Sequence, residues 1–232
     1  MANLSREKIE ALLQEKGRAK AISLAGEDLS GLNLSGLDLT GINLQGANLN
    51  GLVVKGSQMR EANLRQANLE GANLSKTNLS GSDLQGANLR HANLSEVYLL
   101  KCNLTGTDLR QANLAKAKMD EAYAVEANLR NVNLDRVYLM RANLSQADLR
   151  EANLGGANLK DVILAQANLT GATLREAFLE KADLKGANLR GADLHEIILR
   201  LAVYDEQTQW DPGFDPQSAG ATKPKKKWLG LF

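Results

Sequence analysis

The stretch ANLRQANLEGANL at residues 62–74 repeats a five-residue unit, and this unit decides the fold. Leu is the third residue of the unit, with Asn or Asp directly before it and a small residue before that. The register holds without a break from Leu24 to Leu199, where 32 of 36 such positions are Leu and the other four are apolar. Because chance cannot maintain a register of this length, residues 22–201 form one array of internal repeats.

A period of five fits neither regular secondary structure. On an α-helix each Leu would lie about 140° from the last, so no apolar stripe forms. On a continuous strand successive Leu residues would alternate between the two faces. A short extended segment followed by a corner satisfies the pattern, with the small residue and Leu pointing inward and the Asn or Asp pointing outward. Gly fills the last position of every unit from Gly26 to Gly56, as a tight corner favours.

This unit resembles that of the pentapeptide-repeat family, over residues 22–201. The resemblance implies an all-β solenoid, a right-handed quadrilateral β-helix with four pentads per coil and therefore about nine coils. The sequence also carries a period of twenty, because VYLLK at 97–101 recurs as VYLMR at 137–141. Each coil would bury its Leu layer against its neighbours alone, so both ends of the stack need covers.

The segments outside the repeats predict these covers. Residues 1–21 indicate a short capping α-helix, with Ser5 as N-cap, Leu4 and Ile9 placed for a hydrophobic staple, and Gly17 as its end. Residues 202–216 break the register and form an aromatic lid. This lid is similar to the segment that follows the repeats in cyanobacterial members of the family, which has a Thr-x-Trp-Pro core, although here Asp211 precedes the proline. Residues 217–232 indicate a flexible basic-aromatic tail.

The composition excludes several functional classes. The chain has 28 basic and 27 acidic side chains, too balanced for a strongly acidic nucleic-acid mimic or a histone-like cation. The single cysteine, Cys102, excludes an intramolecular disulfide and fits a reducing compartment. The charges throughout residues 1–17 argue against a secretory signal. The sequence has no phosphate loop, zinc spacing or nucleophile elbow, so we expect no enzymatic activity, no cofactor and no metal site.

Stacking every twentieth residue brings arginines into a column at one corner of the rod. The column could contact an anionic partner, such as phosphate groups. Alternatively, Asp108, Asp148 and Glu151 supply the counter-charge and the arginines are solvated. The candidate residues are Arg90, Arg110, Arg130 and Arg150.

A second column has large apolar residues where Asn or Asp is the rule. Exposed apolar side chains in a row indicate an interaction surface. The alternative is that the rings only stiffen the rod, although their spacing of about 9.6 Å makes direct ring contact poor. The candidate residues are Tyr98, Tyr138 and Phe178, with Leu100 and Met140 beside them.

The tail is the third candidate site, because it combines basic and apolar residues. Such a segment suits either a membrane surface or a groove on a partner protein, and the remaining alternative is a tail that only aids solubility. The candidate residues are Lys225, Lys226, Lys227, Trp228, Leu229, Leu231 and Phe232.

Together these features predict a non-enzymatic scaffold or protein-binding rod that presents a side-chain face and a C-terminal peptide to protein partners. One alternative is a peripheral membrane-associated protein held by the tail. Another comes from family members that mimic DNA and protect topoisomerases, but the 19 basic and 20 acidic residues of the repeats argue against mimicry and against a nucleic-acid partner. The cyanobacterial resemblance implies a cytoplasmic protein, with a membrane surface as the alternative location. Because both ends are covered, we expect a monomer rather than a homodimer.

Overall fold

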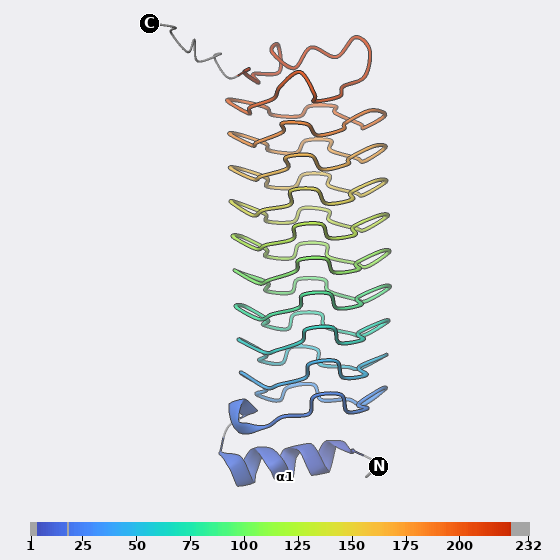
Figure 1. Cartoon of the computed structure of the whole chain (residues 1–232), viewed down its shortest axis with the longest axis vertical. Helices are drawn as coiled ribbons and strands as arrows, with labels where there is room; N and C mark the ends of the chain where they lie inside the picture. The colour runs from blue at the N-terminus through green and yellow to red at the C-terminus, as the bar shows by residue number, and fades with distance from the viewer. Residues whose placement is uncertain (1–3, 18, 224–232) are drawn as a thin grey trace, which may run out of the picture.

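The protein is a straight rod of stacked coils with a helix at one end (Figure 1). The computed structural model describes residues 4–17 and 19–223. The chain begins with helix α1 (Arg6–Lys16), continues through the 3-10 helix η1 (Ala19–Ala21) and then enters the coils. α1 lies across the N-terminal end of the rod, and the chain leaves the coils at the opposite end (Figure 1).

The coils are joined by parallel single-residue bridges between residues twenty apart. Ser23 pairs with Asn43, Asn43 with Asn63, and the same spacing continues to Asp183 and Val203. Within the ladder, the Leu64 amide donates to the Asp83 carbonyl at 2.7 Å and the Asn63 amide donates to the Ile42 carbonyl at 3.0 Å. The predicted right-handed quadrilateral β-helix is therefore confirmed, and each coil has four sides of five residues.

Leu and the small residue two positions before it fill the interior. Almost all are fully buried, including the exceptions Met59 and Ala124 at Leu positions. Hydroxyl groups at the small position find acceptors inside the rod, as Thr77 donates to the Val54 carbonyl at 2.6 Å and Ser82 to the Met59 carbonyl at 2.7 Å. The carbonyls that accept from Ser57, Thr77 and Ser82 belong to the preceding coil, so these buried polar groups also join one coil to the next, whereas Thr107 donates to Leu104 within its own coil.

The corners force a left-handed backbone at the last residue of each pentad. Glycines there have positive φ, as expected, but so do 21 other residues, with φ between 52° and 60°. The Asn or Asp of the pentad holds the turn, because its Oδ1 accepts from the amide two residues later, as Asn63 does from Arg65 at 3.2 Å. The turn is therefore fixed by the Asn as much as by the glycine.

Helix α1 closes the N-terminal end. Ser5 is its N-cap and accepts from the Lys8 amide, and Gly17 ends it in the left-handed conformation, both as predicted. Arg6 Nη1 donates to the carbonyls of Asn33 and Ser35 at 3.0 and 3.2 Å. Those carbonyls belong to the first coil and have no preceding coil to bond. Arg6 thus supplies donors to two carbonyls at an open sheet edge.

The C-terminal cover differs from the prediction at both of its limits. Ala202, Val203 and Tyr204 keep the repeat register, with Tyr204 buried where Leu is the rule. A one-residue insertion follows, because Asn188 pairs with Gln209. The register therefore breaks after Tyr204 rather than at residue 202.

Residues 217–223 also differ from the prediction, because they pack on the last coil and belong to the lid. The Leu199 amide donates to the Ala219 carbonyl at 3.2 Å, and the Tyr204 amide donates to the Thr222 carbonyl at 3.1 Å. These bonds use main-chain atoms, so the small side chains of this segment gave no signal for them.

The predicted aromatic lid covers the last Leu layer. Trp210 packs edge-on against Tyr204, with ring centroids 5.9 Å apart, and stacks on Phe214 at 5.2 Å. Two carboxylates accept from amides of the last coil, Asp205 from Gly186 at 3.0 Å and Asp211 from Gly191 at 2.8 Å. The lid therefore satisfies the backbone edge as well as the apolar core.

Candidate partner-binding site

The aromatic face is the column of every twentieth residue from Tyr98 to Ile198. Its members are Tyr98, Lys118, Tyr138, Asn158, Phe178 and Ile198. Tyr98, Tyr138 and Phe178 are 38%, 45% and 48% exposed, so each ring keeps about half of its surface in solvent. Among the described residues, the aromatic rings in mutual contact are those of the lid. The rings of the aromatic face therefore do not stack on one another.

The alternation of aromatic and non-aromatic residues from Tyr98 to Phe178 hollows this face. A recess of about 560 Å³ lies over Asn158, with Tyr138 and Phe178 as walls. A second recess of about 490 Å³ lies over Lys118, with Tyr98 and Tyr138 as walls. The two recesses share Tyr138, so together they form one groove along the rod with apolar walls at regular intervals.

The two recesses differ in charge. Glu180, at the side of the Asn158 recess, pairs with Arg200 at 2.7 Å and with Lys160 at 3.8 Å. The hydrogen bond from Arg200 holds the pKa of Glu180 below its ordinary value. In the other recess, Lys118 Nζ lies 4.6 Å from the centre of the Tyr98 ring. That recess has four cationic side chains in its lining and one carboxylate, that of Glu96.

The apolar surface continues onto the adjoining face, which the sequence reasoning missed. Tyr123 is 58% exposed and Ile163 is 39% exposed, and both occupy the position that is usually Asn. The signal that identified the aromatic face, a large apolar residue in place of Asn, was also present here.

The edge between the two faces carries both apolar and charged side chains, and Glu121 on this edge pairs with Lys101 and Arg141. Leu100 and Met140 lie on it and are half-buried, and Leu201 lies on the same edge and is 50% exposed. In the described part of the chain, the seven exposed large hydrophobic side chains all lie on these two faces and their shared edge. We call this region the apolar edge; its exposed members are Tyr98, Tyr123, Tyr138, Ile163, Phe178, Ile198 and Leu201.

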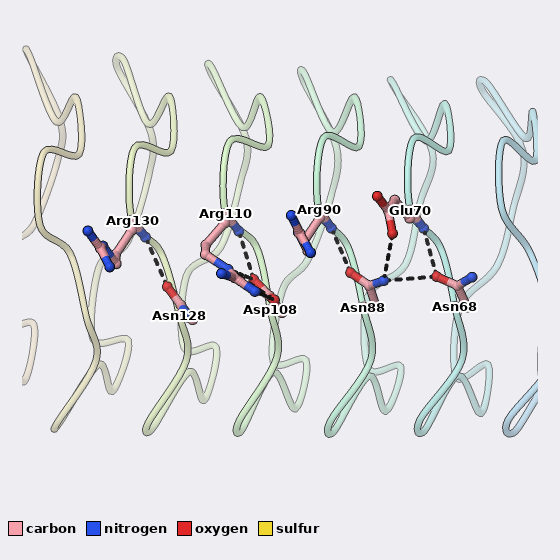
Figure 2. Close-up of polar contacts among 8 residues, drawn as sticks. All are labelled: Asn68, Glu70, Asn88, Arg90, Asp108, Arg110, Asn128 and Arg130. Atoms are coloured by element: carbon pink, nitrogen blue, oxygen red, sulfur yellow. Dashed lines mark hydrogen bonds and ion pairs between the residues drawn. The ribbon is translucent and has the colours of Figure 1, made fainter.

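The predicted arginine column occupies the corner ten residues, or half a coil, away from the apolar edge. Arg110 donates to Asp108 through Nε at 2.9 Å, and Arg150 donates to Asp148 through Nε at 2.7 Å (Figure 2 shows the first pair). These hydrogen bonds lower the pKa of each aspartate. Two of the four arginines are thus neutralised, as one of the two interpretations expected, and Glu151 forms no ion pair with any of them within the described residues.

Arg90 and Arg130 differ from their neighbours in the column. Their main-chain amides bond Asn88 and Asn128 in the usual way (Figure 2). Their Nε atoms, however, are shielded from solvent and have no hydrogen-bond partner in the described part of the chain.

The third predicted site lies outside the described residues. Lys225, Lys226, Lys227, Trp228, Leu229, Leu231 and Phe232 therefore stay predictions. Among residues 4–17 and 19–223, no helix is long and apolar enough to span a membrane.

Two kinds of reactive site are also relevant among the described residues: a metal-binding group and a nucleophilic thiol. These residues include no group of three or more His, Cys, Asp or Glu side chains placed to hold a metal ion. Cys102 donates to the Leu79 carbonyl inside the rod, and burial raises the pKa of its thiol to about 12. This thiol is therefore interior filling rather than a nucleophile.

The comparisons with known proteins agree with the repeat geometry. The family model described as pentapeptide repeats matches eight copies, at residues 22–51, 57–95, 87–123, 125–161 and 163–200. The comparison with curated proteins gives no match.

Several solved structures are similar to this chain. HetL, a protein involved in heterocyst differentiation regulation from the cyanobacterium Nostoc, is 31% identical over 89% of this chain and 95% of its own, with a TM-score of 0.40. The Nostoc pentapeptide repeat protein alr5209 is 39% identical over 44% of this chain and 84% of its own, with a TM-score of 0.43. QnrB1, a plasmid-mediated fluoroquinolone resistance protein, is 18% identical over 82% of this chain and 91% of its own, with a TM-score of 0.57, and shares the fold.

Proposed function

The chain belongs to the pentapeptide-repeat family, and we propose that it is a non-enzymatic binding rod that docks a protein partner on the apolar edge. One observation carries the proposal: the exposed large hydrophobic side chains of the described residues gather on two adjoining faces and their shared edge. The residue between the two inward positions of each pentad is usually Asn or Asp on all four sides, so a random scatter of large apolar replacements would place them on all four faces. Exposed large apolar side chains gathered in one region are typical of a protein interaction site.

The shape of the aromatic face favours a protein over a small molecule. The two recesses are shallow parts of one open groove, whereas a pocket for a small ligand encloses most of it. The ring walls repeat about every 9.6 Å, which is two coils. A protein surface or an extended peptide with apolar side chains at similar intervals could fill both recesses at once.

The contacts at the two ends of the rod support this role. The backbone edges at the two ends are covered by Arg6 and by Asp205 and Asp211. These contacts leave fewer free backbone groups for strand addition at the ends, which favours binding through side chains on the rod faces. Half-exposed Tyr and Phe side chains in fixed positions are effective anchors, because they lose little conformational entropy on binding.

A capture experiment with three variants tests the proposal. The first replaces Tyr98, Tyr138 and Phe178 by Asn, the usual residue of the repeat at this position. The second replaces Asn128, Asn168 and Asn188, on the opposite face, by Ser. The third ends at Lys223, because a shorter chain would lose the lid segment 217–223.

We expect a partner in a lysate of the source organism that binds the wild type and the second variant but not the first. Retention by the first variant would refute docking on the aromatic face. Loss of the partner with the third variant alone would assign binding to residues 224–232 instead.

A further inference from the structure

Arg90, Arg110 and Arg130 form a second feature, which we call the arginine cluster. They lie on consecutive coils and line a recess of about 270 Å³ together with Gln111 and Asn131. The recess lies half a coil from the apolar edge, so a ligand bound in it would leave the apolar edge accessible.

The hydrogen bonding in the cluster is incomplete. Arg110 directs Nε and Nη2 at Asp108, so these donors are occupied. On either side of it, Arg90 and Arg130 have Nε atoms that are shielded from water and lack an acceptor within the described residues. A shielded donor on a charged group is costly when it is unpaired, and native proteins contain few of them. Two in one recess indicate that an acceptor is supplied from outside the described residues.

The charge of the cluster is also only partly compensated. Three guanidinium groups line the recess, and Asp108 is the one carboxylate that pairs with any of them in the described part of the chain. The nearest acid along the column, Glu70, is bonded by Asn88 Nδ2 at 3.1 Å rather than by Arg90 (Figure 2). Coils about 4.8 Å apart hold these like charges close together, which is unfavourable without a counter-ion.

We propose that the arginine cluster binds a phosphoryl group. Three guanidinium groups and one carboxylate leave a net charge of about +2, which matches the charge of −1.5 to −2 on a phosphate monoester at neutral pH. The planar fork of arginine suits two phosphate oxygens at once. A recess of about 270 Å³ accepts a phosphate tetrahedron and leaves room for a few atoms of the molecule that carries it. The same chemistry fits free inorganic phosphate and a phosphate ester.

The test follows the arginine Nε–Hε resonances by NMR while inorganic phosphate, and separately O-phosphoserine, is added at constant ionic strength. Unphosphorylated serine and chloride are the controls. We expect the Arg90 and Arg130 resonances to shift and saturate with one phosphate per chain. Affinity about tenfold higher for O-phosphoserine would indicate a phosphate ester as the ligand, whereas equal affinity would indicate the free anion.

Matched variants locate the binding. R90Q and R130Q should each weaken binding by about tenfold or more, because each removes a fork with an unpaired donor. R190Q lies in the same column beyond the recess and should change the affinity less than about twofold. R90K keeps the charge and serves where R90Q folds poorly; it should still bind several-fold more weakly, because it lacks the fork.

The proposal is overturned if the resonances do not saturate or if chloride moves them equally. It is also overturned if R190Q loses as much affinity as R90Q, since that would reflect general attraction by positive charge.

Discussion

Replacing Phe178 by Asn tests whether its ring serves to bind a partner or to stabilise the rod. Full burial of a Phe side chain is worth about 1.5–3 kcal/mol, and Phe178 is 48% exposed, so its loss costs about 1 kcal/mol. The new Asn would accept from the Glu180 amide, as Asn158 accepts from the Lys160 amide at 3.3 Å, which returns about 1 kcal/mol. The expected change in the free energy of unfolding is therefore within about 1 kcal/mol of zero.

The assay is urea unfolding followed by far-UV circular dichroism, with Leu179→Asn as the matched control. Leu179 is the next residue and is fully buried, so its replacement deletes core volume and buries an amide, at a cost of about 3 kcal/mol or more. If Phe178→Asn lost 2 kcal/mol or more, near the cost of the control, the ring would stabilise the rod. The argument that its exposure serves a partner would then fail.

Three further predictions concern the rod itself. Gln146→Gly should raise the free energy of unfolding by about 0.5–1 kcal/mol, because Gln146 has φ 60° and glycine relieves the left-handed strain; an unchanged or lower urea midpoint would contradict this. The hydrogen bond from Arg150 lowers the pKa of Asp148, so its stabilising effect is present above the ordinary pKa of Asp and is lost as the pH falls below about 4. Asp148→Asn should therefore flatten the acid limb of a stability–pH curve, and an unchanged limb would be inconsistent with the pairing. Burial raises the pKa of Cys102 to about 12, so its thiol should react with a disulfide reagent at pH 8 only after unfolding, and rapid reaction of the native protein would contradict the buried position.

The sequence predicted the fold well because its rule is local. Each pentad specifies two inward residues, one outward residue and a corner, so a single register describes the whole array. The helix α1 was also predictable, since Ser5 and Gly17 are local capping signals. The lid limits were not, because residues 219–222 join the last coil through main-chain atoms that carry no side-chain pattern.

The candidate sites were predictable as columns but not as contacts. The twenty-residue period placed Tyr98, Tyr138 and Phe178 on one face, whereas the recesses between them depend on side-chain volume in three dimensions. The arginine column was also found, but its division into paired and unpaired members depends on rotamers. Arg110 reaches Asp108, whereas Arg90 and Arg130 have Asn in the position of that carboxylate, and only the structure shows that their Nε atoms find no partner among the described residues.

Site-specific photo-cross-linking tests the central claim, that a protein docks on the apolar edge, most directly. A photoreactive phenylalanine is placed at Phe178, and in a second protein at Asn168, which is ten residues away on the opposite face. The account predicts a cross-linked protein adduct from position 178 that disappears when Tyr138 is changed to Asn, with no such adduct from position 168. Equal adducts from both positions, or none from position 178 while the partner is still captured, would contradict it.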